Sequence, residues 1–146
     1  MIAIGSDHGG YALKQEILKH LEEKGIEYLD CGCFSEESVD YPDIAEAVCA
    51  NIIDGTCDKG ILLCGTGIGI SMSANKIQGI RAALCHSEFD ARMCREHNNA
   101  NVMCLGGRTM GPNITLEMVD LFLNINFSED PRHNRRVDKI MALENR

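Results

Sequence analysis

The sequence lacks any run of apolar residues long enough to cross a bilayer, which takes about 18 to 20 in a row. Its first residues, Met1 to Gly5, also lack the basic start and the long apolar centre of a secretory signal peptide. A membrane protein and a secreted protein are therefore both disfavoured. We expect a cytoplasmic protein with no membrane partner.

Positive charge is scarce, since 14 Lys and Arg stand against 22 Asp and Glu for a net charge of −8. Proteins that bind nucleic acid use basic surfaces to neutralise phosphates, so this balance argues against a nucleic-acid partner. The tail is the exception, because a short segment there carries Arg132, Arg135, Arg136, Lys139 and Arg146. Such a local basic segment could bind the phosphate group of a small metabolite.

Cysteine is plentiful, with eight residues, but the spacings that mark zinc sites are absent. No Cys-x-x-Cys pair occurs, and no cluster of Cys and His has metal-ligand spacing. We therefore expect no bound metal. In a reducing cytoplasm most of these thiols, such as Cys49 and Cys104, are expected to act as small hydrophobic groups. Cys64 is set apart by its position.

Short apolar segments alternate with segments of helical periodicity along the chain. Strands are predicted at 2–4, 26–29, 61–63, 80–84 and 102–105, and helices at about 13–24, 42–53, 70–76, 87–96, 113–127 and 138–145. Strands that are apolar throughout are typical of parallel sheets covered on both faces. The pattern predicts an α/β fold: one domain over 1–146, a Rossmann-like three-layer α/β/α sandwich with a five-stranded parallel sheet. A basic C-terminal helix, from about residue 131, is expected to complete the site.

The first helix shows a clear apolar face, with Leu13, Ile17 and Leu21 at helical spacing. The charged residues of this segment, Lys14, Glu22, Glu23 and Lys24, are expected mostly on the opposite face. His20 is interpreted as a surface histidine, because the rest of this helix is amphipathic.

The most informative stretch runs from Lys59 to Lys76, KGILLCGTGIGISMSANK. An apolar strand ends in Cys64, three glycines follow at alternate positions, and a helix-like segment begins after them. Such a strand, loop and helix offer backbone N–H groups and a positive helix end to an oxygen anion. With a thiol beside them, these groups could remove a proton and stabilise the resulting charge. The spacing differs from the dinucleotide fingerprint G-x-G-x-x-G, so a dinucleotide is not expected.

Polar residues also follow two other strands. Asp7 and His8 come after the first strand, and Arg108 comes just after the fifth. Because the carboxyl ends of parallel strands share one edge of the sheet, these side chains should lie near Cys64.

Several of the candidates have simpler explanations. Asp7 could only cap a turn or a helix, and His97 and Asn98 could belong to an ordinary polar loop. Arg132 and Arg136 could be solvated charges, although their spacing of four puts them on one face of a helix.

Five segments taken together resemble one family. They are GSDHGG at 5–10, CGTGIGISMSANK at 64–76, GIRAA at 79–83, EHNNAN at 96–101 and GGR at 106–108. They are similar to the ribose-5-phosphate isomerase B group, which includes the subunits of galactose-6-phosphate isomerase, and the similarity covers essentially the whole chain. The resemblance implies an aldose–ketose isomerase of the pentose phosphate pathway, with a phosphorylated sugar as substrate and no metal or cofactor. It also implies a homodimer with shared active sites, which some members pair into a tetramer.

The resemblance implies catalytic roles for four side chains. Asp7 and His97 would assist opening of the sugar ring, Cys64 would be the base that forms a cis-enediolate, and Thr66 would move protons between oxygens. The enediolate would be held by Asn98 and by the loop residues Gly65, Gly67, Ile68 and Gly69.

The resemblance also implies how the substrate phosphate is bound, by His8, Arg108, Arg132 and Arg136. One chain would supply Cys64 together with Arg132 and Arg136, and its partner would supply His97 and Arg108. Some members carry a glutamate base directly after the glycine loop. Here that position is Ile70, so this chain would depend on Cys64.

Two alternatives to ribose 5-phosphate isomerisation remain open. The substrate could be the 6-phosphate of allose or galactose, since the chemistry is the same. The chain could also be a sugar-phosphate sensor without catalysis, which the presence of both Cys64 and His97 disfavours.

Overall fold

The computed structural model describes residues 1–145, and Arg146 of the basic tail lies outside the described residues. Five parallel strands form one sheet in the order β2-β1-β3-β5-β4. The strands are β1 (Ile2–Ser6), β2 (Tyr28–Asp30), β3 (Lys59–Cys64), β4 (Ala82–Leu84) and β5 (Val102–Gly106). The predicted five-stranded parallel sheet is therefore confirmed.

The helices are α1 (Tyr11–Glu23), α2 (Tyr41–Ile53), α3 (Ile68–Ala74), α4 (Glu88–Glu96), α5 (Pro112–Asn124) and α6 (Pro131–Ala142), and a 3-10 turn, η1 (Leu143–Asn145), follows. The last helix starts at Pro131, where the basic C-terminal helix was expected, and not at 138, where the apolar periodicity had placed its start. Asp130 caps it by accepting a hydrogen bond from the N–H of Arg132 at 2.8 Å. None of the helices in residues 1–145 is both long and apolar enough to span a membrane.

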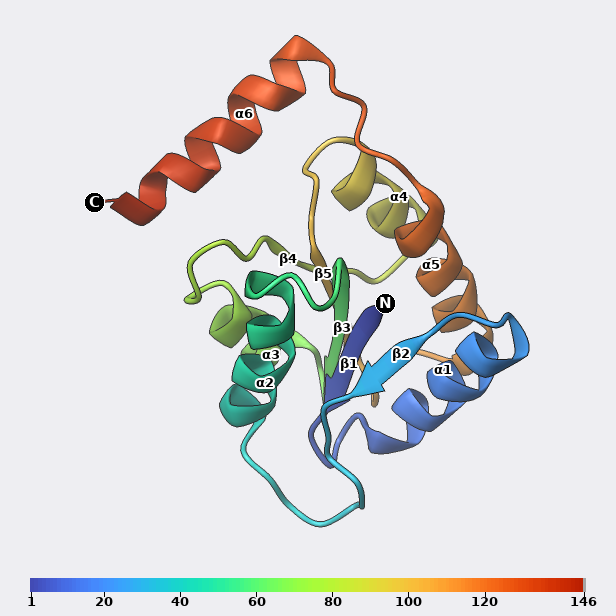
Figure 1. Cartoon of the computed structure of the whole chain (residues 1–146). Helices are drawn as coiled ribbons and strands as arrows, with labels where there is room; N and C mark the ends of the chain where they lie inside the picture. Colours follow the sequence, from blue (N-terminus) through green and yellow to red (C-terminus); the bar gives the residue numbers. More distant parts are fainter. Residues whose placement is uncertain (146) are drawn as a thin grey trace.

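The sheet is the middle of three layers (Figure 1). On one face the apolar side chains of α1, α4 and α5 pack against the sheet, with Ile17, Met118 and Phe122 fully buried. On the other face α2 and α3 pack through residues such as Val48 and Ile70. Because helices cover both faces of the sheet, this arrangement confirms the predicted three-layer α/β/α sandwich.

The strand order places a topological switch point between β1 and β3. From β1 the chain moves outward to β2, and from β3 it moves the other way, towards β5 and β4. The loops after β1 and β3 therefore diverge, and such a crevice is where open α/β sheets bind ligands.

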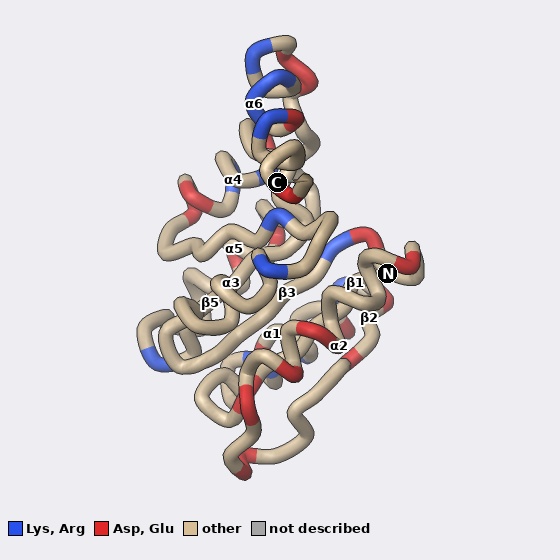
Figure 2. The backbone as a smooth tube through the Cα atoms, turned by 90° about the vertical axis from the view of Figure 1, so that its left-hand side faces the viewer, with Lys and Arg blue, Asp and Glu red and all other residues tan. Residues whose placement is uncertain are grey.

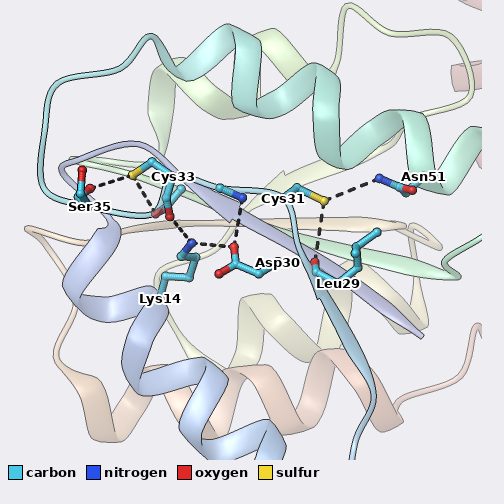
Figure 3. Close-up of polar contacts among 9 residues, drawn as sticks. Lys14, Leu29, Asp30, Cys31, Cys33, Ser35 and Asn51 are labelled. Atoms are coloured by element: carbon cyan, nitrogen blue, oxygen red, sulfur yellow. Dashed lines mark hydrogen bonds and ion pairs between the residues drawn. The ribbon is translucent and has the colours of Figure 1, made fainter.

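Lys14 differs from the prediction, because its side chain is fully buried. Its Nζ donates to Oδ1 of Asp30 at 2.7 Å and to the carbonyl oxygen of Cys33 at 2.5 Å (Figure 3). The rings of Tyr11 and Phe34 lie 5.6 and 5.4 Å from the ammonium group. The loop that follows β2 covers this position on α1, so a long side chain there ties the loop to the helix.

α6 stands apart from the three layers and ends near the C-terminus (Figure 1). Its Lys and Arg positions lie close together along one helix, as the blue segments of Figure 2 show. Arg132, Arg136 and Lys139 are all exposed. Only the side chains of His133 and Val137 are buried.

Candidate active site

Three turns meet at the carboxyl edge of the sheet, after β1, β3 and β5. A Cβ on Gly9 would lie 2.9 Å from the nitrogen of Gly65, and one on Gly107 would overlap the carbonyl oxygen of Gly9. The N–H of Gly107 donates to the carbonyl of Cys64 at 2.8 Å, and that of Arg108 donates to the carbonyl of Gly65 at 2.9 Å. The glycines are needed for this close approach, which brings together the three turns as the sequence predicted.

Cys64 ends β3 and lies at the start of the glycine loop. Its side chain is 4% exposed, and the N–H of Gly67 donates to its Sγ at 3.2 Å. Gly67 has a φ of 80°, in the left-handed region that a side chain would strain. The turn therefore directs a backbone donor at the sulfur, where a negative charge would be stabilised. Ile70 is fully buried in the core beside α2 and takes no part in this edge.

The other members of the loop are more accessible. Thr66 and Ile68 are exposed, and the N–H of Ile68 donates to Oγ1 of Thr66 at 3.2 Å. The guanidinium of Arg108 lies over the loop, with its Nη1 3.2 Å from the point where a Cβ on Gly65 would be. Arg108 therefore lies near Cys64, as its position after the fifth strand predicted, and it contacts the glycine loop of its own chain. The resemblance had instead implied that it serves the partner's site.

Asp7 follows β1 and shapes the turn before α1. Its Oδ1 accepts hydrogen bonds from the N–H groups of Gly9 and Gly10, at 2.8 and 3.2 Å. The turn-forming role that the sequence left open is thus present. Asp7 and His8 also line a cavity of about 540 Å³, and Nδ1 of His8 accepts from the N–H of Val39 at 3.3 Å.

Tyr41 is a residue of this region that the sequence did not reveal. Its ring lies against Gly69, since a Cβ there would be 2.5 Å from the ring, and it lines the cavity beside Asp7. No local pattern in the sequence indicates this contact, because it joins the start of α2 to a loop far along the chain.

His97 and Asn98 lie at the opposite edge of the sheet. They precede β5, whose first residue pairs with Gly60, whereas Cys64 pairs with the last residue of β5. These two ends of the strand pair are about 13 Å apart at the usual rise per residue. Within one chain, the structure therefore does not bring His97 to Cys64.

His97 instead contacts the segment that carries the basic helix. Its ring lies against the ring of His133, with centroids 4.2 Å apart and planes inclined by 33°. Nδ1 of His133 is 2.6 Å from Oγ of Ser128, and its Nε2 is 3.5 Å from Nη2 of Arg132. A guanidinium can only donate, so Nε2 of His133 is the acceptor in its contact with Arg132.

These contacts regroup the predicted site residues. The sequence assigned Arg132 and Arg136 to the same half as Cys64. In the structure α6 places Arg132 with His97, and Arg108 is the arginine that lies beside the Cys64 loop. The reason is the connection after α5, which leads α6 to the amino edge of the sheet; the N–H of Ser128 donates there to the carbonyl of Glu96 at 3.0 Å.

Exposed apolar side chains lie beside both groups of predicted site residues. Ile68 and Met72 of α3 are 52% and 65% exposed next to the glycine loop. At the other edge, Ile140 and Leu143 are 45% and 54% exposed and line a groove of about 710 Å³ together with Asn98.

All eight cysteines are free thiols, and most are buried, as predicted. Burial raises the pKa of Cys49 to about 12, and it also raises that of Cys104 well above its ordinary value. Within residues 1–145, no group of three or more Cys, His, Asp or Glu side chains is arranged to hold a metal ion.

A sequence model of the ribose/galactose isomerase family matches residues 2–140. The chain belongs to the ribose/galactose isomerase family. Its relatives in that family include ribose-5-phosphate isomerase B of Escherichia coli, which is 45% identical over 145 residues, 99% of this chain and 97% of the E. coli protein. Ribose-5-P isomerase B of Listeria innocua is 43% identical, over 98% of this chain and 96% of that protein.

Solved structures of the family superpose closely on the chain. Ribose-5-phosphate isomerase B of Clostridium thermocellum gives a TM-score of 0.96 at 50% identity, covering 99% of this chain and 97% of that one. The Thermotoga maritima enzyme gives 0.94 at 50% identity, with 97% of both chains covered. The family and fold expected from the sequence are thus both confirmed.

Proposed function

We propose that the chain is an aldose–ketose isomerase that interconverts ribose 5-phosphate and ribulose 5-phosphate, with Cys64 as the base. The observation that carries this proposal is the sulfur of Cys64 at the glycine loop, with the N–H of Gly67 donating to it at 3.2 Å. A base with a nearby backbone donor suits a proton transfer that produces an oxyanion. The names of the relatives supply the substrate class.

The reaction begins with the furanose form of ribose 5-phosphate. Opening of its ring removes a proton from the hydroxyl on C1 and adds a proton to the ring oxygen. Asp7 and His97 share these two transfers, with His97 coming from the partner subunit. The product is the open-chain aldehyde.

Isomerisation then moves one proton between carbons. The thiolate of Cys64 takes the proton from C2, the C–H electron pair forms the C1=C2 bond, and the carbonyl pair moves onto O1. The N–H groups of the loop from Gly65 to Gly69, with Asn98, stabilise this cis-enediolate. Thr66 passes the proton of O2 to O1, and the thiol returns its proton to C1, which leaves a ketone at C2.

The proposed site combines two halves from two copies of the chain. One copy supplies the edge with Asp7, Cys64 and Arg108, and the other supplies the edge with His97 and Arg132. The separation of the two edges within one chain supports this arrangement, and so do the exposed Ile68, Met72, Ile140 and Leu143 that border them. Burial of such side chains between two copies is the usual driving force for a homodimer.

The phosphate of the substrate would be bound by basic side chains from both halves. Arg132 and Arg136 are exposed on one face of α6, and Arg108 and His8 lie at the Cys64 edge. Guanidinium groups bind phosphate through paired hydrogen bonds, so three arginines suit a dianionic group. The eight free thiols fit a cytoplasmic location.

The proposal is tested by assaying the purified chain alone with ribose 5-phosphate, allose 6-phosphate and galactose 6-phosphate. We expect the highest kcat/KM for ribose 5-phosphate, and the same rate after dialysis against EDTA. A higher kcat/KM for allose 6-phosphate or galactose 6-phosphate would mean that this hexose phosphate, and not ribose 5-phosphate, is the substrate. Binding of all three sugars without turnover would instead support a sensor.

A further inference from the structure

Arg95 is a charged residue buried beside the predicted site. It lies on the last turn of α4, two residues before His97, and is 8% exposed. Among the ion pairs of residues 1–145, none includes Arg95. Burial of a charge without a counter-ion is costly unless its donors are used in hydrogen bonds. The guanidinium of Arg95 must therefore be compensated by its hydrogen bonds, and the groups that accept them are the parts of the chain that Arg95 fixes.

Two of these hydrogen bonds fix the loop after α4. Nη1 of Arg95 donates to the carbonyl of Ala100 at 2.7 Å and to Oδ1 of Asn99 at 3.0 Å. Asn99 has a φ of 49°, in the left-handed region that non-glycine residues rarely adopt, so this conformation needs support. Nε of Arg81 adds support by donating to the carbonyl of Asn99 at 2.8 Å. These hydrogen bonds fix Asn99 and Ala100, the residues directly after His97 and Asn98 in the same loop.

A third hydrogen bond reaches the chain that leads to α6. Nε of Arg95 donates to the carbonyl of Ile125 at 3.2 Å, directly after α5. Three residues later Ser128 contacts His133, whose ring lies against His97. One guanidinium therefore joins the loop of His97 to the connection that places Arg132.

We infer that Arg95 is a positioning residue, which sets the ring-opening group His97 at a fixed separation from the phosphate-binding Arg132. This inference rests on the proposed function. In ribose 5-phosphate the phosphate and the ring oxygen are a fixed number of bonds apart, so the two groups must be spaced to match. A misplacement of about 1 Å at such a site can cost roughly 100-fold in rate. Arg95 itself does not contact the substrate.

The test compares Arg95→Met with Arg92→Met, which changes an exposed arginine one turn earlier on α4. We expect kcat/KM for ribose 5-phosphate to fall by at least about tenfold in Arg95→Met and to stay within about twofold in Arg92→Met. The wild type is assayed in parallel. If the wild type has no activity, the proposed function is wrong; if the wild type is active and Arg95→Met behaves like it, the inference about Arg95 is wrong.

A second readout separates positioning from simple loss of folded enzyme. An enzyme that cannot open the ring uses only the open-chain sugar, so its forward rate stops rising with enzyme concentration once spontaneous ring opening is limiting. We expect such a plateau for Arg95→Met and a proportional rate for the wild type. Full activity of folded Arg95→Met, or a reduced rate that stays proportional to its concentration, would overturn the inference.

Asn99→Gly keeps the inference testable should Arg95→Met not fold. It removes the side-chain acceptor of Arg95, and glycine readily adopts the left-handed backbone of this position. We expect the same plateau with a smaller loss, roughly three- to tenfold. Wild-type behaviour of Asn99→Gly together with an unfolded Arg95→Met would mean that Arg95 serves stability alone.

Discussion

The backbone N–H of Gly67 donates a hydrogen bond to the sulfur of Cys64, with 3.2 Å between nitrogen and sulfur. The left-handed turn at Gly67 makes this contact possible, because it points the N–H back towards the end of β3. A thiolate at Cys64 therefore has a donor fixed by the fold, independent of any side chain.

Replacement of Cys64 by alanine or serine should nearly abolish isomerisation and leave sugar-phosphate binding largely intact. Loss of a general base typically costs about 10²–10⁴-fold in rate, and a serine hydroxyl does not ionise usefully near neutral pH. Steady-state kinetics with ribose 5-phosphate and a binding measurement provide the check. Cys64→Ala with more than half of the wild-type kcat would show that another group is the base.

Alkylation with iodoacetamide should inactivate the enzyme through Cys64, and saturating substrate should protect it. Cys31 is the competing thiol, since it is the one cysteine that is not buried. Burial and neighbouring groups raise the pKa of Cys31, which lowers its reactivity. The control is Cys31→Ser, which should be inactivated at the wild-type rate. Mass spectrometry locates the label. If Cys31→Ser is not inactivated by iodoacetamide, Cys31 and not Cys64 is the thiol whose alkylation causes the loss of activity.

Removal of Asp30 should destabilise the fold strongly, because it leaves the ammonium of Lys14 buried without its carboxylate. Breaking a buried pair in this way costs about 3–5 kcal/mol. The matched control is Lys24→Met, which breaks an exposed pair with Asp120 and should cost less than about 1 kcal/mol. Urea unfolding measures both, and equal effects of the two substitutions would contradict the structural role of Lys14.

Stability should fall as the pH drops below about 6.5, in part through His133. Burial lowers the pKa of His133 from its ordinary value, and His97, Arg132 and Arg136 lower it further, although Asp130 opposes them. The unfolded chain then binds a proton at a pH where the folded chain does not, so the free energy of unfolding decreases with falling pH and levels off below the folded-state pKa.

Urea unfolding between pH 7 and pH 5 measures this contribution. His133→Asn should show a shallower pH dependence than the wild type, whereas His86→Asn, at an exposed position, should keep the wild-type slope. If the free energy of unfolding of His133→Asn depends on pH as steeply as that of the wild type, His133 does not cause the loss of stability.

The sequence predicted the layers and the Cys64 edge because both depend on local patterns. Apolar strands end in polar residues or glycines, and parallel topology gathers those ends at one edge. Lys14 escaped prediction because its burial depends on a loop that comes more than fifteen residues later. The sequence also did not predict that Arg132 lies with His97. The path of the chain after α5 is fixed by contacts between residues far apart in the sequence, such as that of Arg95 with Ile125.

The central claim, that each active site is shared between two chains in this grouping, is tested most directly by mixing variants that are each nearly inactive alone. Cys64→Ala lacks the base, and Arg132→Ala lacks a guanidinium that binds the phosphate, so each is first assayed alone to show this loss. Cys64→Ala combined with Arg132→Ala, under conditions of proven subunit exchange, should restore activity towards about a quarter of the wild-type value. Half of the dimers are then mixed, and each mixed dimer has one intact site. His97→Ala combined with Arg132→Ala should restore nothing, because both changes fall in the same half-site. Recovery in the second mixture, or its absence in the first, would contradict the account.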